Sequence, residues 1–225
     1  MNRISVIIPA LNESENISQT LLSTQALRKN GHEVIVVDGG SDDDTCNIAS
    51  DFTDKLITSQ PGRAKQMNRG AQAATGDIYV FLHADTILPE AAEQLIISAI
   101  STDQFLWGRF NVRLSGNHIL FRAIEFSMNL RSRITGIVTG DQTFCIARKL
   151  FDEIHGFPEI QLMEDIAISQ KLKKIKRPIL LDGTVLTSSR RWEQNGIIKT
   201  VLKMWWFRFS FMLGADPLSL ARQYD

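Results

Sequence analysis

Short runs of hydrophobic residues alternate with longer amphipathic stretches along the first hundred residues of the chain. The runs are continuous and rich in β-branched residues, as in strands that are buried on both faces of a parallel sheet. In the stretches between them apolar residues recur at helical spacing, as Leu21, Leu22 and Ala26 do. The predicted strands are 4–8, 33–37, 55–58 and 78–82, and the predicted helices are 14–29, one opened by Ser41 or Asp42, 62–74 and 89–100. This order predicts βαβ units and an α/β fold with a mainly parallel sheet flanked by helices.

The rhythm changes after residue 104. The predicted strands are then 105–114, 143–147, 179–181 and 184–188, and the predicted helices are 117–133 and 166–174. In helix 117–133 the polar residues form one stripe, and the apolar residues lie elsewhere on the helix. A last segment, 196–213, is apolar nearly all round, so we expect it to be buried in the core, against a partner or in a membrane. We therefore divide a single domain into 1–104, 105–195 and 196–225.

Two of the hydrophobic runs end on acids. Asp38 follows the run 34–37, and His83-Ala84-Asp85 follows the run 78–82. In open α/β sheets the ligand binds just beyond the carboxyl ends of the strands. Carboxylates at that edge suit the polar groups of a nucleotide or a divalent cation, which prefers oxygen ligands. Each acid could also simply stabilise a turn or cap a helix, so neither identifies a ligand alone.

Three further segments combine charges in ways that suit a phosphorylated ligand. Gly62-Arg63-Ala64-Lys65-Gln66 places cations at a helix start, where they oppose the helix dipole unless an anion binds there. Glu164-Asp165 stands among apolar neighbours, and partial burial would raise a carboxyl pKa toward the range of a general base. Arg190-Arg191-Trp192 joins two cations to a broad ring. A solvated basic face, a helix cap and a surface cation–π pair are the corresponding structural alternatives.

Composition narrows the class of protein. The formal net charge is zero and the pI is near 6.9, so nucleic acid is not an expected partner. The charge is uneven, because residues 1–170 carry 14 Lys/Arg and 21 Asp/Glu, whereas residues 171–225 carry 11 and 4. Cys46 and Cys145 are too few for a disulfide framework. The stretch 4–10 is too short for a secretion signal, and no run approaches the roughly 18 apolar residues that span a membrane, so we expect a cytoplasmic location.

Taken in chain order, the motifs strongly resemble those of the family 2 glycosyltransferases, which are inverting enzymes with the GT-A fold. The motifs are Ser5-Val6-Ile7-Ile8-Pro9-Ala10-Leu11-Asn12-Glu13, Val37-Asp38-Gly39-Gly40-Ser41-Asp42-Asp43-Asp44-Thr45, His83-Ala84-Asp85, Glu164-Asp165 and Arg191-Trp192. Gly140-Asp141-Gln142 and Ser189-Arg190-Arg191-Trp192 are similar to a compact bacterial subgroup of that family. The resemblance implies that 1–104 binds a nucleotide sugar and that 105–195 holds the acceptor and the catalytic groups.

The resemblance also implies a role for each candidate residue. A nucleoside-diphosphate sugar would lie across the strand ends, and Asp85 would hold Mg²⁺ or Mn²⁺ against its diphosphate. Asp165 would be the general base that deprotonates an acceptor hydroxyl, and Arg191 would stabilise the departing diphosphate. The nucleotide-binding candidates are Pro9, Ala10, Leu11, Glu13, Asp38, Gly40, Arg63, Gln66 and Ala84. The acceptor candidates are Asp141, Glu164 and Trp192, with Arg122 and Asn129.

Three departures from the family pattern refine this interpretation. His83 stands where an Asp is commoner, so Asp85 is the expected direct metal ligand. Leu11 stands where an aromatic residue is frequent. Ser188 replaces a Gln that processive members carry, so we expect transfer of a single sugar rather than synthesis of a polymer.

Two other functions stay open. A sugar nucleotidyltransferase would need a Gly-rich loop after the first strand to bind a triphosphate, and Pro9-Ala10-Leu11-Asn12-Glu13 offers none. A catalytically inactive scaffold that binds a nucleotide sugar or a lipid is the other, since fold does not determine function. For the tail, packing on the core or in a homodimer is favoured over peripheral contact with the inner face of a membrane, because Lys199 and Arg208 project on opposite sides of the helix.

Overall fold

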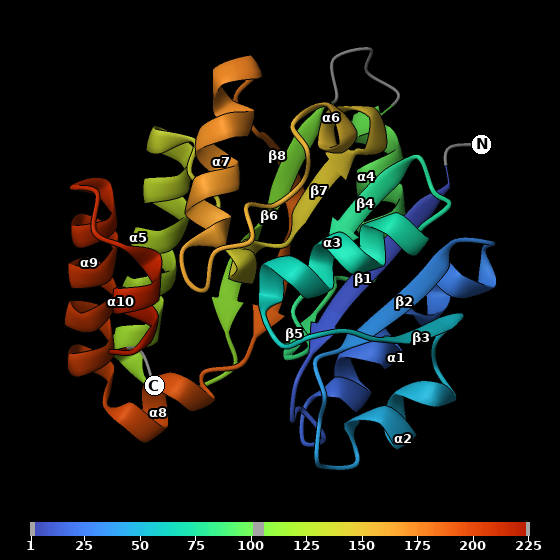
Figure 1. The fold of residues 1–225 in the computed structure, drawn as a ribbon, viewed down its shortest axis with the longest axis horizontal. Coiled ribbons are helices and arrows are strands. Elements are labelled where there is room, and N and C mark those ends of the chain that lie inside the picture. Colours follow the sequence, from blue (N-terminus) through green and yellow to red (C-terminus); the bar gives the residue numbers. More distant parts are fainter. Residues whose placement is uncertain (1–2, 101–105, 224–225) are drawn as a thin grey trace.

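An eight-stranded sheet runs through the molecule in the order β3-β2-β1-β4-β7-β6-β8-β5 (Figure 1). The computed structural model describes residues 3–100 and 106–223. The strands are β1 (Ile4–Ala10), β2 (Glu33–Asp38), β3 (Lys55–Thr58), β4 (Ile78–Phe81), β5 (Thr86–Ile87), β6 (Trp107–Leu114), β7 (Phe144–Ala147) and β8 (Ile179–Thr187). The strand predicted from Phe105 begins at Trp107 within the described residues; residue 105 and the proposed boundary at 104/105 lie outside them.

The sheet is mixed but mostly parallel, which confirms the predicted fold class. Strand β1 pairs in parallel with β2 and β4, β2 with β3, and β6 with β8. Strand β7 is antiparallel to β4 and β6, and β5 is antiparallel to β8. Every residue of β1, β2 and β4 is buried, as expected of strands covered on both faces. Ala10 lies opposite Asp38, so β1 and β2 end at the same level.

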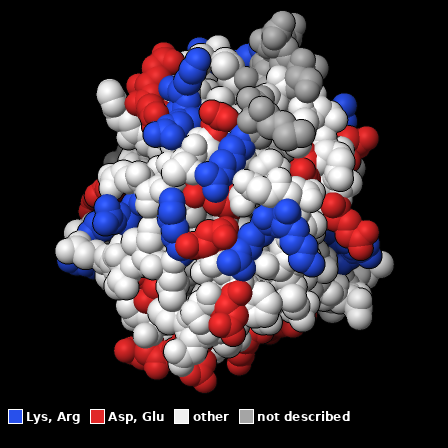
Figure 2. Space-filling view, turned by 90° about the vertical axis from the view of Figure 1, so that its right-hand side faces the viewer, with Lys and Arg blue, Asp and Glu red and all other residues white. Residues whose placement is uncertain are grey.

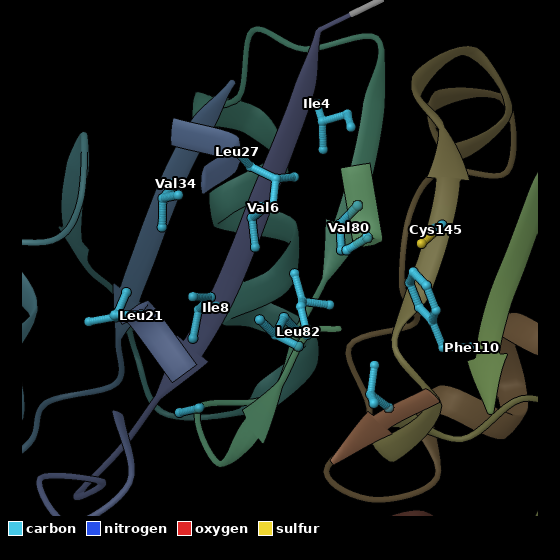
Figure 3. Close-up of a cluster of buried hydrophobic side chains, with 14 of the residues drawn as sticks. Ile4, Val6, Ile8, Leu21, Leu27, Val34, Val80, Leu82, Phe110 and Cys145 are labelled. Carbon is cyan, nitrogen blue, oxygen red and sulfur yellow. The ribbon is translucent and has the colours of Figure 1, made fainter. Parts of the chain in front are cut away.

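Helices cover both faces of this sheet. They are α1 (Ile17–Lys29), α2 (Thr45–Ser50), α3 (Arg63–Ala73), α4 (Ala92–Ile100), α5 (Ile119–Thr135), α6 (Arg148–Glu153), α7 (Glu164–Ile175), α8 (Arg190–Asn195), α9 (Ile197–Met212) and α10 (Pro217–Ala221), with a 3₁₀ turn η1 at Gly140–Gln142. Ile4, Val6 and Ile8 of β1 face the core beneath α1 and α4 (Figure 3). Ile7, which points to the other face, packs beneath α3, α6 and α7.

Several predicted boundaries are wrong for local reasons. The helix after β2 begins at Thr45 rather than at Ser41 or Asp42. Ser41 does not cap it because its hydroxyl oxygen accepts from the N–H of Asn12 while the hydroxyl donates to Asp38, and the backbone N–H of Thr45 donates to Asp43. Helix α1 begins at Ile17 and α4 at Ala92, each three residues later than predicted. The strands predicted at 179–181 and 184–188 are one strand, β8, and β5, α6, α8 and α10 were not predicted.

The polar stripe of α5 faces the sheet. Strand β7 pairs only with the first part of β6, at Trp107–Arg109. On that side of the strand, the backbone of 112–114 therefore needs other hydrogen-bond partners. Asn129 bonds both backbone groups of Val112, at 2.9 and 3.0 Å, and Arg122 donates to the carbonyls of Leu114 and Gly116 at 3.0 and 2.9 Å. These groups complete the edge of β6, so the acceptor candidates Arg122 and Asn129 are already engaged within the fold. The apolar side of α5 is left exposed, with Ile119, Phe126 and Ile134 between 64% and 77% accessible.

Helix α9 packs on the rest of the chain through one stripe only. Phe207 is buried against Leu162, Met163, Ile166 and Leu220, so α9 and α10 cover the loop that leads into α7. Phe211 packs against the same cluster, whereas the aromatic side chains at 205, 206 and 209 stay about 60% exposed. Core contact therefore accounts for only part of the apolar character of this segment. None of the described helices is both long and apolar enough to cross a membrane.

Candidate functional site

Asp38 builds the turn that follows β2. Its carboxylate is buried and accepts hydrogen bonds from the N–H groups of Gly40 and Ser41 and from the hydroxyl of Ser41, at 2.8, 3.0 and 2.5 Å. Burial alone would raise the pKa of Asp38, but these hydrogen bonds outweigh it and hold the pKa below its usual value. Gly40 has a φ of +94°, a conformation that glycine adopts without strain. Asp38 is therefore ionised at the end of the strand, with Gly40 beside it.

The loop after β1 is tied to the loop after β2. The N–H of Asn12 donates to the hydroxyl of Ser41, and the side-chain oxygen of Asn12 accepts from the N–H of Asp42, both at 2.9 Å. The N–H of Glu13 donates to the hydroxyl of Thr45 at 2.8 Å. Leu11 stays exposed at the tip, whereas Pro9 and Ala10 are buried at the end of β1. The nucleotide-binding candidates of both strands thus sit in one rigid pair of loops.

Gln66 holds the two strand ends together. Its amide donates at 2.8 Å to the carbonyls of both Ala10 and Val37, and the residue is 3% exposed. A Cβ added at Gly39 would lie 3.1 Å from the Gln66 amide nitrogen, so the chain passes close over it. This geometry supports a positioning role for Gln66 rather than direct contact with a nucleotide.

Charged residues from four separate segments meet beyond these strand ends. Arg63, at the start of α3, lies 3.9 Å from Glu164 at the start of α7. His83, after β4, lies 3.4 Å from Asp141 in η1. The N–H of Gly140 donates at 3.2 Å to Asp165, which joins η1 to α7. The structure therefore brings together Arg63, Asp141, Glu164 and Asp165, four of the residues proposed from the sequence.

The charges in this cluster perturb one another. Burial and the neighbouring Asp165 raise the pKa of Glu164, while Arg63 opposes that rise. Burial would lower the pKa of His83, but its contact with Asp141 raises it overall. The same contact holds the pKa of Asp141 below its usual value against the effect of burial. Displaced pKa values of this kind gather at functional sites.

Asp85 lies at the edge of the cluster and is partly exposed. Its carboxylate accepts from the hydroxyl of Thr86 at 3.3 Å, and its backbone carbonyl accepts from the N–H of Ser188 at 3.1 Å. The preceding Ala84 is buried, and its carbonyl accepts from the hydroxyl of Thr20 at 2.8 Å. Ala84 and Ser188 thus fix the backbone on which Asp85 stands.

Asp85 is the carboxylate that the sequence proposed as a metal ligand. Within 3–100 and 106–223, no group of three or more His, Cys, Asp or Glu side chains converges to hold a metal ion. Mg²⁺ commonly binds through one or two carboxylates together with substrate phosphates rather than in an all-protein cage. A single accessible carboxylate such as Asp85 fits a cation that arrives with a diphosphate.

Arg190 links the C-terminal part of the chain to the loop after β1. Its guanidinium donates to Glu13 at 3.1 Å and to Glu15 at 3.3 Å. These carboxylates, together with Asp85, raise the pKa of Arg190 against the effect of burial. Helix α8 lies at the same end of the molecule as the carboxyl ends of β1 and β2 (Figure 1). The sequence interpretation singled out the neighbouring Arg191 and missed this ion pair, which has no signature at a separation of 177 residues.

Arg191 and Trp192 occupy the first turn of α8. Trp192 lines a hollow of about 460 Å³ together with Asp141. The candidate acceptor residues Asp141 and Trp192 therefore share one cavity, although the sequence places them 51 positions apart.

Backbone strain gathers around the same loops. Among the described residues, four other than glycine have a positive φ: Asn12, Thr143, His155 and Met163. Asn12 lies in the loop after β1, Thr143 directly follows η1, and Met163 directly precedes Glu164. Such conformations persist where surrounding structure holds them, and they cluster at functional sites. Because Asn tolerates the left-handed region, Asn12 is the one of these four residues whose positive φ the sequence could suggest.

On the face beyond β3, acidic and basic side chains are interspersed, and acidic ones gather at the end of the molecule where β1 and β2 terminate (Figure 2). The acid-rich stretch 42–44 follows β2 at this end. Negative charge at the strand ends suits a cation better than a bare anion.

Comparison with known proteins identifies the family. The model of the family described as glycosyl transferase family 2 matches residues 5–157, well over half of the chain. A probable glycosyltransferase, YdaM of Bacillus subtilis, is 26% identical over 91% of this chain and 53% of its own length. The dolichol-phosphate mannosyltransferase of Pyrococcus furiosus is 26% identical over 80% of this chain and 53% of its own length. The chain thus spans about half the length of these curated relatives.

Solved structures with the same fold include two nucleotide complexes. Residues 1–349 of TarS from S. aureus, in complex with UDP, give a TM-score of 0.64 at 21% identity over 83% of this chain and 60% of that one. The glucosyl-3-phosphoglycerate synthase of Mycobacterium tuberculosis, in complex with Mn²⁺, UDP and phosphoglyceric acid, gives 0.59 at 20% identity over 83% and 68%. At these identities the similarity establishes the fold.

Proposed function

This chain belongs to glycosyl transferase family 2, and we propose that it transfers one sugar from a nucleoside-diphosphate sugar to an acceptor hydroxyl with inversion. The observation that carries the proposal is that the carboxylates of Asp85, Asp141, Glu164 and Asp165 surround Arg63 closely enough to raise its pKa, beyond the ends of β1, β2 and β4. The nucleotide-bound structures of similar fold support a nucleotide sugar as the donor. In this proposal 1–104 binds the donor, 105–195 holds the acceptor and catalytic groups, 196–225 forms the tail, and the location is cytoplasmic.

The donor half supplies the nucleotide contacts. The paired loops after β1 and β2 offer Leu11, Glu13, Asp38 and Gly40 to the base and ribose, and a ribose hydroxyl would donate to the remaining lone pairs of Asp38. Arg63 at the start of α3 would bind the diphosphate, where the free N–H groups of the helix add to its charge. Arg190 keeps the Glu13 side chain in place from the other side.

Asp165 serves as the base. The acceptor oxygen bonds to the anomeric carbon from the face opposite the diphosphate, the bond from that carbon to the diphosphate oxygen breaks, and the acceptor proton passes to Asp165. The N–H groups of Gly140 and Ile166 donate to the two carboxylate oxygens at 3.2 and 2.7 Å and so fix its orientation. Arg191 stabilises the charge that develops on the departing diphosphate.

Asp85 would hold Mg²⁺ or Mn²⁺, which supplies positive charge against the diphosphate when bound. His83 would stay with Asp141 and keep η1 beside the strand end. Asp85 would then be the carboxylate through which the protein itself binds the metal ion.

Calorimetric titration of UDP, GDP and CMP, with and without Mn²⁺, tests donor binding. We expect one nucleotide to bind only with the metal, and Asp85→Asn to weaken it by about tenfold or more, since a charge-assisted contact contributes roughly 1.5–3 kcal/mol. Asp182→Asn, at an exposed position in β8, is the matched control and should bind as the wild type does. Absence of binding by all three nucleotides would contradict the proposed donor class.

Asp165→Asn separates catalysis from binding. Loss of the general base should lower the turnover of the nucleotide sugar by about 10²–10⁴-fold, while the Kd of the nucleotide changes little. The measurement is release of the free nucleoside diphosphate, with nucleotide binding recorded on the same sample. An Asp165→Asn protein that keeps wild-type turnover would rule out Asp165 as the base and favour the scaffold alternative.

A further inference from the structure

Two adjoining hollows lie beside the proposed base, along α9. The first, of about 460 Å³, is bounded by α5, α8 and α9 and reaches Asp141. The second, of about 700 Å³, is bounded by α5, α7 and α9. Both are lined by Arg131, Leu202, Trp205 and Arg208, so the two arginines stand where the hollows meet. In Figure 1 the helices α5, α7 and α9 stand together at the side of the sheet remote from β3.

Arg131 is half-buried there, and part of its guanidinium lacks a hydrogen-bond partner. Its Nε and Nη2 atoms are buried and have no hydrogen-bond partner. Among the described residues, no ion pair includes Arg131 or Arg208. Burial and the nearby Arg208 lower the pKa of Arg131 to about 10, although Asp165 and Asp141 act in the opposite direction. Burying guanidinium N–H groups without partners is costly, so an anion that accepts from them would be favoured.

The walls around these arginines are apolar and open to solvent. Trp205, Trp206, Phe209 and Met212 of α9 are between 57% and 73% exposed. Leu120 of α5 and Ile198 and Leu202 of α9, which line the first hollow, are 39%, 67% and 61% exposed. Contiguous apolar surface of this kind marks a binding site for a protein, a membrane or an apolar ligand.

The charges select among these occupants. A second copy of the chain placed on this surface would bring more arginines and lysines to it, since residues 171–225 carry 11 Lys/Arg and only 4 Asp/Glu. An amphiphile with a negative headgroup satisfies both features at once, because its charge meets the arginines and its chain meets the aromatic side chains.

We infer that the acceptor is a lipid with an anionic headgroup, which binds between Arg131 and Arg208 while its apolar chain lies along α9 and α5. This inference rests on the proposed function, because the headgroup hydroxyl must reach Asp165. Asp141, which lines the first hollow and is influenced by Arg208, stands between the arginine pair and His83. The arrangement puts the charged end of the acceptor beside the catalytic acids and the apolar end on the surface.

Titration of the full chain with decyl phosphate, below its micelle concentration, tests the inference. The readouts are calorimetry and the fluorescence of the tryptophans, three of which (192, 205 and 206) line the hollows. We expect decyl phosphate to bind, and Arg208→Gln and Arg131→Gln each to weaken it about tenfold to a hundredfold, as for loss of a charge-assisted contact. Arg208→Lys should retain most of the affinity. Arg69→Gln, at an exposed position on α3, is the matched control and should bind as the wild type does.

Three results would overturn the inference. Equal affinity for neutral decyl maltoside, unchanged by Arg208→Gln, would mean an apolar groove without an anion site. Competition by inorganic phosphate as strong as that of decyl phosphate would mean an anion site without a lipid. A dimer in sedimentation velocity that Trp205→Ala dissociates would mean that a second copy covers the surface.

Parallel titration of UDP with Mn²⁺ keeps this test separate from the proposed function. Retained UDP binding without decyl phosphate binding would remove the lipid acceptor alone. Decyl phosphate binding without nucleotide binding would instead remove the transferase proposal and leave the lipid site. UDP binding checks that Arg208→Gln is folded. The test therefore stands on that variant even if Arg131→Gln fails to fold.

Discussion

Glu33 shows how one buried polar residue organises the edge opposite the site. Its carboxylate, at the start of β2, accepts from the hydroxyls of Ser5 and Thr75 and from the N–H of Gly76, and it pairs with Lys55 at 3.1 Å. Burial alone would raise its pKa, but these hydrogen bonds lower it from 4.5 to about 2. The residue therefore ties β1 and β2 to the chain entering β4.

Glu33 predicts a pH-dependent stability. Because its pKa in the folded protein, about 2, lies below the unfolded value of 4.5, its contribution is present above about pH 4.5 and is lost as the pH falls toward 2. Glu33→Gln should lower the free energy of unfolding at neutral pH by about 2 kcal/mol and flatten the dependence in that window. Urea unfolding between pH 7 and pH 3 measures both effects. Glu90→Gln, at an exposed site, is the control, and equal stability of the two variants would contradict the prediction.

At the site, the motifs identified residues but not their partners. Asp38, Asp85 and Asp165 follow recognisable sequences, so their positions beyond strand or helix ends could be predicted. The contacts of Arg190 with Glu13 and of His83 with Asp141 could not, because they join segments far apart in the chain. Nor did any pattern single out Arg131, which matters to the inferred lipid site because its buried Nε and Nη2 atoms lack hydrogen-bond partners.

Among the elements, α3 depends on close approach to the sheet. A Cβ added at Gly70 would lie 2.4 Å from Cγ2 of Ile7 and 3.0 Å from Cγ2 of Val37, so only glycine lets the helix rest on β1 and β2 at this distance. The approach places Gln66 within reach of the strand ends and Arg63 beside Glu164. The donor side of the site therefore depends on a packing contact one to two turns along the helix.

Gly70→Ala should destabilise the protein. Alanine favours a helix by about 1 kcal/mol, but the overpacking against Ile7 and Val37 costs about 1–3 kcal/mol, so we expect a net loss of up to about 2 kcal/mol. The midpoint of urea unfolding measures it. Arg69→Ala, on the exposed side of the same helix, is the control and should change stability by less than about 0.5 kcal/mol. A gain in stability for Gly70→Ala would show that the sheet can yield at this point.

Helix α9 offers a matched pair of phenylalanines. Phe207 is 1% exposed against Met163 and Ile166, whereas Phe209 is 57% exposed on the outer side. Phe207→Ala should lower the free energy of unfolding by about 3 kcal/mol, and Phe209→Ala by less than about 0.5 kcal/mol. Because Met163 and Ile166 flank Glu164 and Asp165, Phe207→Ala should also lower turnover. Thermal unfolding and nucleotide release check the two effects, and similar losses for both variants would contradict this packing.

In the whole molecule, stability is unevenly distributed. Strands β1, β2 and β4 are buried throughout and are covered by helices on both faces. The tail formed by α9 and α10 rests on one small apolar cluster. Segments with few buried contacts open at lower free energy than the core.

Hydrogen exchange should reveal this gradient. We expect the amides of β1, β2 and β4 to exchange most slowly, with protection approaching the global free energy of unfolding, and those of α9 and α10 to exchange much faster. Exchange followed by mass spectrometry measures the order, and helix α8, in which no residue is buried, is an internal reference for fast exchange. Protection of α9 equal to that of β1 would mean that the tail is held by contacts beyond its apolar cluster.

The sequence by itself determined the alternation of strands and helices in the first hundred residues, the mostly parallel sheet and the acids at the strand ends. These follow from local patterns, because hydrophobic runs specify buried strands, and parallel pairing brings their carboxyl ends, with the acids beyond them, to the same edge. Asp38 and Asp85 are where that reasoning puts them. The boundary predicted after β2 failed because Ser41 bonds Asp38 and Asn12 instead of capping the helix.

Only the tertiary structure decided how the two halves of the chain meet. It brought Arg63 to Glu164 and Arg190 to Glu13, and it turned the polar stripe of α5 toward β6 because β7 does not extend along the second half of that strand. It also left the aromatic side of α9 exposed around Arg131 and Arg208. Those outcomes depend on which surfaces remain uncovered once the sheet has formed, and the spacing of residues along the chain carries no record of that.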